Sequence, residues 1–156
     1  MVVNDNCINL IKSFEGLFLE AYHDSIDPIG VDTIGYGTIQ YPPTYLGGKK
    51  VRVGDPKITK DQAIEFLTWE INQKALAIKS LVSVNLTDNQ FGAIVSFAYN
   101  LGEGALKSST LLKEINSNPN NLDIRNQFLK WNMASGKVIT GLKRRREAEA
   151  NLYFTP

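Results

Sequence analysis

Residues 15–38 hold the acidic and hydroxyl side chains best suited to acid–base cleavage. This stretch places a carboxyl group at Glu15, two more at Asp24 and Asp27, and a hydroxyl at Thr33, the first residue of TIGYGT. Cleavage by two carboxyl groups needs one that stays protonated as general acid and one that stays ionised to activate water or stabilise a cation. The alternative interpretation is that these acids and glycines only occupy a helix end and a turn.

The element that must position Glu15 is a short helix at residues 4–14. Asn4 or Asp5 can cap its start. Its apolar face, at helical spacing, consists of Cys7, Leu10, Ile11 and Phe14. Glu15 then stands where the helix meets a loop, and Gly16 relaxes the backbone. Partial burial there would raise the pKa of the Glu15 carboxyl, as a general acid requires, whereas an ordinary surface position would not.

Short strands are expected at residues 33–39 and 49–53, joined by the proline-stiffened connection YPPTYLGG. Gly35 and Gly37 could suggest a phosphate loop, but the full dinucleotide spacing is missing and no helix clearly follows. From residue 58 the pattern becomes helical. A capping box at residues 59–62 begins a long helix over residues 60–83, which we expect to connect two lobes.

The rest of the chain is expected to be helical. A second capping box begins at Thr87, and shorter helices follow around residues 106–115, 122–132 and 142–152. Phe128 and Trp131 are interpreted as core residues rather than a platform for sugars. The basic run at residues 143–146 is too short for a nucleic-acid patch, and it is interpreted as a solvated helix face paired with Glu147 and Glu149.

Composition excludes several classes of protein. The 156 residues are 43% hydrophobic and 21% charged, which fits one globular domain and not a disordered or membrane-spanning chain. The net charge of +1 provides no overall field for nucleic acid. Cys7 and His23 are the single cysteine and histidine, so neither an intramolecular disulfide nor a zinc site is expected. Because the first residues lack the apolar core of a signal peptide, we expect the protein in a reducing cytoplasm before release.

Five segments together resemble one family: FEGLFLEAYHD, TIGYGT, LTDNQFGAIVSFAYNLGEGAL, FLKWNMASGKVITGL and RRREAE. In this order, and nearly from end to end, the chain resembles the phage-type lysozymes, or endolysins, of glycoside hydrolase family 24. The resemblance implies an α+β, mainly helical lysozyme-like fold. It divides the single domain into a small sheet-containing lobe at about 15–57, a connecting helix at about 58–83, and a helical lobe at about 84–156 that includes the N-terminal helix.

The resemblance also assigns roles to the acidic stretch. Glu15 in FEG would be the general acid, Asp24 in AYHD the base that activates water, and Thr33 a residue that positions this water. It implies inversion at the anomeric carbon, with the two carboxyl groups roughly 6.5–9.5 Å apart. The substrate would be the β-1,4 bond between N-acetylmuramic acid and N-acetylglucosamine in peptidoglycan, cleaved without cofactor or metal.

The sequence departs from the family pattern at two positions. Eight residues separate Asp24 from Thr33, where the common form has five, and Asp27 restores the five-residue spacing. Asp24 is preferred as base because it keeps its register with Glu15, and Asp27 is the alternative. Thr38 stands where many members have a histidine with a structural pairing role, so local stability is in question more than chemistry.

The resemblance nominates two residues of the helical lobe. Asn100 in FAYNLG would hydrogen-bond an N-acetyl group or a hydroxyl of the glycan, with a helix-end cap as the alternative. An arginine of the GLxxRRxxE pattern, Arg145 rather than Arg144, would approach Glu15, lower its pKa and hold the acid in place.

We therefore expect a monomeric peptidoglycan hydrolase that neither spans a membrane nor binds nucleic acid, and that depends on a separate holin-type pore for release. The alternatives are a lytic transglycosylase acting on the same bond, an inactive peptidoglycan-binding module, and a nucleic-acid-binding helical protein that would rest on the basic run alone.

Overall fold

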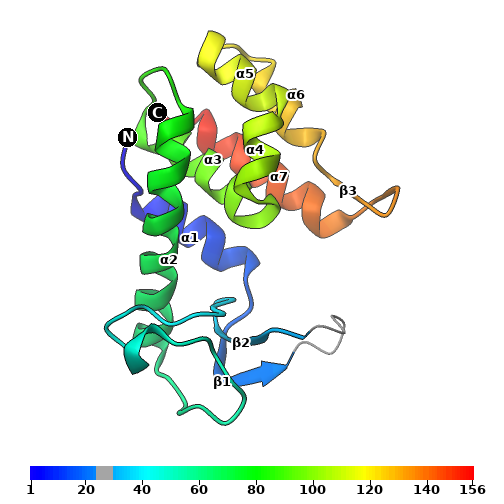
Figure 1. Cartoon of the computed structure of the whole chain (residues 1–156). Coiled ribbons are helices and arrows are strands. Elements are labelled where there is room, and N and C mark those ends of the chain that lie inside the picture. Colours follow the sequence, from blue (N-terminus) through cyan, green and yellow to red (C-terminus); the bar gives the residue numbers. More distant parts are fainter. Residues whose placement is uncertain (24–29) are drawn as a thin grey trace. The chain divides into compact units, whose positions relative to one another are not determined.

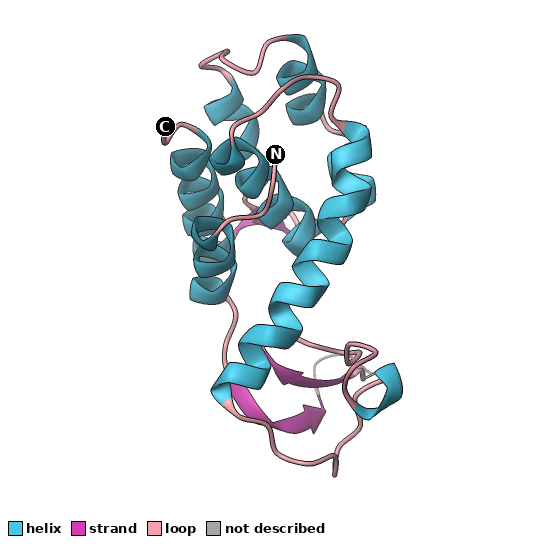
Figure 2. Ribbon diagram, turned by 90° about the vertical axis from the view of Figure 1, so that its left-hand side faces the viewer, coloured by secondary structure: helices cyan, strands magenta, loops and turns pink. Residues whose placement is uncertain are grey.

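The structure, a computed structural model, describes residues 1–23 and 30–156. The helices in these residues are α1 (Asp5–Phe14), α2 (Lys60–Leu81), α3 (Asp88–Leu101), α4 (Glu103–Ser108), α5 (Thr110–Ser117), α6 (Ile124–Leu129) and α7 (Thr140–Tyr153), with a single 3-10 turn at Leu46–Gly48 (Figure 1). Two antiparallel pairs of strands accompany them: β1 (Phe18–His23) with β2 (Asp32–Gly35), and β3 (Met133–Ala134) with β4 (Lys137–Val138). Helices dominate, as Figure 2 shows, and the predicted α+β class is confirmed.

The chain divides into two compact units. One consists of Lys12–Gln73, and the other combines Met1–Ile11 with Lys74–Pro156. We call them the sheet unit and the helical unit. The division falls inside α1 and inside α2, so each of these helices contributes residues to both units.

In the sheet unit, β1 and β2 form a hairpin in which Tyr22 pairs with Thr33. The expected strand at 33–39 is interrupted, because Gly35 (φ 65°) and Gly37 (φ 83°) take left-handed backbone conformations. Ile34 and Thr38 exchange two backbone hydrogen bonds of 2.9 Å across the resulting turn. The strand expected at 49–53 is wrong as well, since residues there form only an isolated bridge between Gln40 and Lys50.

The long helix α2 begins at the predicted capping box. The Gln62 N–H donates to the Thr59 hydroxyl at 3.1 Å, and the Thr59 N–H donates to the Gln62 side chain at 2.9 Å. The helix ends at Leu81, two residues before the predicted end. Its buried stripe consists of Ala63, Phe66, Leu67, Ile71, Ala75 and Ile78, which is the helical spacing that the sequence indicates.

The helical unit is built around α3. Eight consecutive residues of this helix, Phe91–Ala98, are buried, and α7 and α4 pack against it. Its start is the second predicted capping box, with Thr87 and Gln90. At Gly92 an added Cβ would lie 2.8 Å from the Cβ of Cys7, so this glycine lets α1 approach α3 closely. Burial raises the pKa of the Cys7 thiol to about 12, which makes it a packing group and not a nucleophile.

Aromatic side chains complete this core. Phe128 is fully buried, and its ring lies 6.0 Å from that of Phe97. Trp131, which is half-buried, meets Phe97 edge-on at 5.3 Å between ring centroids. The prediction that Phe128 and Trp131 belong to the core is confirmed for Phe128, and Trp131 packs at its border.

Candidate active site

Glu15 is the first residue after α1, half-buried in the sheet unit. The preceding turn of α1 is fixed by Lys12, whose ammonium lies 5.9 Å from the centre of the Tyr36 ring. Tyr36 is 5% exposed and belongs to the turn that carries Gly35 and Gly37. The sequence therefore placed Glu15 correctly, at the junction of a packed helix and a loop.

Thr33 lies in β2, directly opposite Tyr22 of β1. Its hydroxyl donates to the Val31 carbonyl at 3.1 Å, so its proton is engaged and its oxygen remains an acceptor. Thr38, at the position of the family's histidine, is 1% exposed, and its hydroxyl has no hydrogen-bond partner within the described part of the chain. An unpaired buried hydroxyl costs stability, which agrees with the expectation for this departure.

The two candidate bases, Asp24 and Asp27, lie outside the described residues. The residues that flank them are described, and they include a pair that the sequence analysis missed. His23 ends β1 and Asp32 begins β2, and the imidazole Nδ1 lies 2.8 Å from the Asp32 Oδ1. The other carboxylate oxygen of Asp32 accepts the Val53 N–H at 3.0 Å. The hydrogen bond with His23 and then that with Val53 hold the pKa of Asp32 below its ordinary value.

Gly30 packs against the same imidazole. Its backbone is left-handed (φ 26°), and an added Cβ would lie 1.9 Å from the ring of His23. A side chain at residue 30 would therefore displace the ring from Asp32. His23 is the last residue of β1 and pairs with Asp32, the first residue of β2. A histidine and an aspartate at the facing ends of two paired strands are the signal by which the sequence could have indicated this contact.

In the helical unit, the basic run is not the solvated face that the sequence suggested. Arg145 and Arg146 are 4% and 0% exposed, and Glu149 is fully buried with them, so that expectation is wrong. Only Lys143 and Arg144 of the run are exposed. The reason is that α7 packs against α3, and Arg145 and Arg146 donate hydrogen bonds to oxygen atoms of that helix.

Glu149 is the centre of this buried network. Its carboxylate accepts the Ser96 hydroxyl at 2.7 Å and the Arg146 Nη2 at 3.0 Å, and its Oε2 lies 2.7 Å from the Arg146 Nε. Arg145 donates through Nε to Glu149 at 3.3 Å and through Nη2 to the Ser96 carbonyl at 3.4 Å. Burial raises the pKa of Glu149, and the opposing effects of Arg146, Ser96 and Arg145 limit that rise.

Asn100, near the end of α3, is exposed and connected to the network. Arg146 donates from Nη2 to its Oδ1 at 2.9 Å. The C-cap of α3 is Gly102, whose N–H donates to the Ala98 carbonyl. Glu15 and Thr33 thus belong to the sheet unit, and Asn100 and Arg145 to the helical unit.

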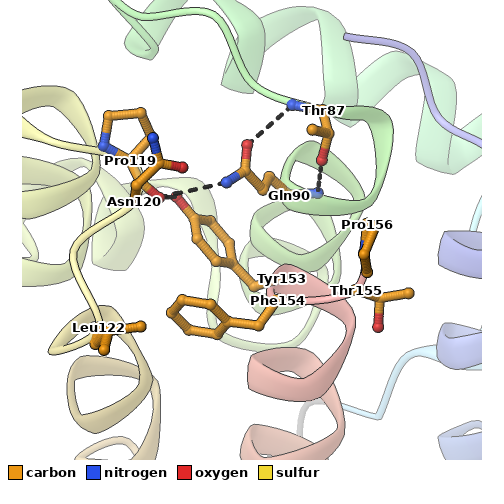
Figure 3. A pocket seen from close by; sticks show the side chains of 9 residues that line it. All are labelled: Thr87, Gln90, Pro119, Asn120, Leu122, Tyr153, Phe154, Thr155 and Pro156. Atoms are coloured by element: carbon orange, nitrogen blue, oxygen red, sulfur yellow. Dashed lines mark hydrogen bonds between the residues drawn. The ribbon is translucent and has the colours of Figure 1, made fainter.

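A hollow of about 250 Å³ lies elsewhere in the helical unit, beside the C-terminal end of α7. Figure 3 shows the Gln90 side chain, which accepts the Thr87 N–H and donates to the Pro119 carbonyl. Tyr153 also donates to the Pro119 carbonyl, at 2.9 Å. None of the nine lining residues has a carboxylate, imidazole or thiol side chain. This hollow is therefore not a candidate for acid–base chemistry.

Residues 1–23 and 30–156 contain no group of three or more His, Cys, Asp or Glu side chains arranged to hold a metal ion. None of their helices combines the length and the hydropathy needed to cross a bilayer.

Comparison with known proteins identifies the family. The family model described as phage lysozyme matches residues 12–149. The endolysin of Bacillus phage B103 is 41% identical over 158 aligned positions, which cover 99% of this chain and 55% of that protein. The chain thus spans about half the length of this curated relative, and the same share of the endolysin of Bacillus phage PZA.

Two solved structures are similar over their full length. A mutant lysozyme of Salmonella phage P22 has a TM-score of 0.83 and 33% identity, with 99% of both chains covered. The muramidase domain of SpmX from Asticaccaulis excentricus has a TM-score of 0.76 and 31% identity, again with 99% of both chains covered. The match of the family model over most of the chain, the sequence relatives and the shared fold together show that this protein belongs to the phage lysozyme family.

Proposed function

We propose that this protein is an endolysin that hydrolyses the β-1,4 bond from N-acetylmuramic acid to N-acetylglucosamine in bacterial peptidoglycan. The observation that carries the proposal is its membership of the phage lysozyme family over residues 12–149, which include the acid and hydroxyl of the catalytic pattern. Those two residues, Glu15 and Thr33, belong to the same compact unit, in the positions that the pattern requires of them: a helix end and the strand before the IGYG turn.

In the proposed mechanism, Glu15 protonates the glycosidic oxygen while an ionised aspartate removes a proton from water on the opposite face of the sugar. That aspartate is Asp24, with Asp27 as the alternative. A water molecule between the two carboxyl groups requires a separation of roughly 6.5–9.5 Å and gives inversion at the anomeric carbon. Thr33 positions this water as an acceptor, because its own proton is donated to the Val31 carbonyl.

The proposal also assigns roles to two residues of the helical unit, Arg145 and Asn100. In this proposal Arg145 has the acid-orienting role of the family pattern, and Asn100 would hydrogen-bond the glycan. Support for Arg145 comes from the motif and from its burial, since its guanidinium is fixed by Glu149 and the Ser96 carbonyl. Such an anchored cation would keep its place when substrate binds.

The proposal extends to the setting of the enzyme. We infer a single monomeric domain with lobes at about 15–57 and 84–156, formed in the cytoplasm of a producing bacterium and released through a holin-type pore. The chain would act on the cell wall without cofactor or metal. A nucleic-acid-binding role loses support because half of the basic run is buried in ion pairs.

The test is an analysis of the products released from purified peptidoglycan by wild type, Glu15→Gln and Glu20→Gln. Glu20→Gln is the matched control, because Glu20 is an exposed carboxylate of β1 that pairs at the surface with Lys57. We expect reducing muropeptides from wild type and the control, and a rate at least about 100-fold lower from Glu15→Gln. Anhydro products would reassign the protein to the lytic transglycosylases, and binding without cleavage by wild type would make it a peptidoglycan-binding module.

A further inference from the structure

The Asn100 carboxamide is held in one orientation by a buried arginine. The Arg146 Nη2 lies 2.9 Å from the Asn100 Oδ1. A guanidinium has donors and no acceptor, so only the oxygen of the amide can face it. The amide nitrogen of Asn100 must then point away from Arg146, and Asn100 is an exposed residue. Within residues 1–23 and 30–156, this nitrogen makes no hydrogen bond.

Arg146 is itself fixed on three sides. Its Nε lies 2.7 Å from the Glu149 Oε2, its Nη2 also donates to the Glu149 Oε1 at 3.0 Å, and its guanidinium lies 5.1 Å from the centre of the Phe97 ring. With no exposed surface, it has no solvent to turn toward. The orientation of the Asn100 amide is therefore set by the core of the helical unit rather than by the ligand.

The charge of Arg146 also changes what the amide prefers to bind. A cation that donates a hydrogen bond to the oxygen of an amide polarises that amide. The N–H groups of the same amide then become stronger hydrogen-bond donors. The best neutral partner for such a donor is the carbonyl oxygen of another amide. Peptidoglycan offers amide carbonyls on the acetamido groups of its sugars and along its stem peptides.

We propose that Arg146 is a positioning residue that turns the Asn100 amide so that its nitrogen donates a hydrogen bond to an amide carbonyl of the substrate. This inference rests on the proposed function and deepens it, because it states which atom of Asn100 faces the substrate and which group of the substrate it selects. An ammonium group of the substrate is disfavoured at this position, because the Arg146 cation already lies beside the Asn100 oxygen.

The substitution Asn100→Asp separates the two faces of the amide. A carboxylate keeps the oxygen that Arg146 requires and forms a charge-assisted bond with it, so we expect a melting temperature equal to or above that of wild type. It replaces the outward donor by an acceptor, so we expect KM to rise about three- to tenfold with kcat nearly unchanged. Asn100→Ala should show the same rise in KM together with a lower melting temperature.

The matched control is Asn151→Asp. Asn151 is an exposed residue of α7 whose Oδ1 accepts the Arg125 Nη1 at 2.8 Å, so the same change is made at the same kind of contact. Both KM and kcat of this variant should equal those of wild type. Unchanged KM for Asn100→Asp, or a melting temperature below that of Asn100→Ala, would overturn the inference.

Arg146 is tested by a double-mutant cycle. Arg146→Lys keeps a charge but loses the fork that reaches Glu149 and Asn100 together, so its KM should rise and its melting temperature fall. Because both substitutions act through one N–H group, Arg146→Lys and Asn100→Asp should not add in their effects on KM. Additive effects would show that Arg146 does not act through Asn100, and the Asn100 variants remain informative if Arg146→Lys fails to fold.

The substrate group is identified with two forms of purified peptidoglycan. On glycan strands freed of stem peptides, a KM of Asn100→Asp that is still higher than that of wild type assigns the carbonyl to an acetamido group. Equal KM values on these strands assign it to a stem-peptide amide. Failure of the proposed function is distinct, since wild type would then release no products. In that case binding is measured instead, as the amount of protein that sediments with insoluble peptidoglycan. Less Asn100→Asp than wild type should sediment, and equal sedimentation of the two would overturn the inference.

Discussion

The Thr33 hydroxyl restricts which group can act as the base. It donates its proton to the Val31 carbonyl, so it meets a water molecule as an acceptor that holds one of the water protons. It has no capacity to remove that proton, because a hydroxyl is not basic at neutral pH. Thr33 thus orients the nucleophile in the proposed mechanism, and proton removal falls to an ionised aspartate, Asp24 or Asp27.

Asp24 and Asp27 are expected to differ in their contribution to activity. Asp24→Asn should lower kcat by at least about 100-fold, since a general base contributes that much or more. Asp27→Asn should leave kcat within about threefold of wild type, because its register with Glu15 is not that of the family pattern. The measurement is the rate of reducing-end release from purified peptidoglycan, with melting temperatures to verify folding. The opposite result, an inactive Asp27→Asn and an active Asp24→Asn, would transfer the role of base to Asp27.

The pairing of β1 with β2 derives part of its stability from His23 and Asp32, the last residue of β1 and the first residue of β2. Asp32 is held by His23 and by the Val53 N–H, and these contacts lower its pKa. A carboxyl that binds its proton more weakly in the folded than in the unfolded state favours folding while it is ionised. This contribution is complete above the ordinary aspartate pKa of about 3.9 and is lost as pH falls through the lower pKa of folded Asp32.

We therefore expect the difference in unfolding free energy between wild type and Asp32→Asn to shrink as pH falls from about 5 to about 3. Chemical denaturation at several pH values measures it. His23→Ala removes the largest cause of the lowered pKa, so wild type and this variant should also converge in stability over the same range. A difference that stays constant down to the lowest pH would contradict the role of the pair.

The contact between α1 and α3 depends on a glycine. Gly92→Ala would bring a methyl group to 2.8 Å from the Cβ of Cys7, closer than two carbon atoms can pack. We expect the variant to lose about 1–3 kcal/mol of unfolding free energy, measured by denaturant titration. Gly104→Ala in α4 is the control, because nothing lies within 4 Å of its added Cβ. It should be neutral or gain up to about 1 kcal/mol, and equal losses at both positions would contradict the close contact.

Local signals were predictable from the sequence, and distant pairings were not. The capping boxes of α2 and α3 were found because a cap involves residues three positions apart. The hairpin of β3 and β4 was missed because two-residue strands leave no periodic pattern, although Ser135 and Gly136 supply its turn with two left-handed residues.

In the candidate site, too, the sequence predicted the features that depend on neighbouring residues and missed those that depend on distant ones. Glu15 at a helix end and Thr33 in a strand followed from local pattern and motif. The burial of Arg146 did not, because an arginine three residues before Glu149 has the same spacing on a solvated helix face as in a buried network. What distinguishes the two cases is Ser96 and Asn100, which lie 53 and 46 positions from their partners along the chain.

Burial of these arginines also determines the charge that the protein presents to a polymer. The chain has 17 basic and 16 acidic residues, for a net charge of +1. Two of the four cations in the basic run are enclosed with Glu149, which leaves Lys143 and Arg144 exposed. The two exposed charges of this run, on a protein with a net charge of +1, add little long-range attraction to an anionic cell wall or to DNA.

Recognition of the wall must then come from short-range contacts, which are little affected by salt. We expect kcat/KM on purified peptidoglycan to change by less than about threefold between roughly 20 and 200 mM salt. The double variant Lys143→Gln, Arg144→Gln should match wild type across this range and show the same weak affinity for DNA. A steep fall in kcat/KM with salt, abolished by that double variant, would mean that the exposed pair steers the protein to its polymer and that charge rather than close contact governs the encounter.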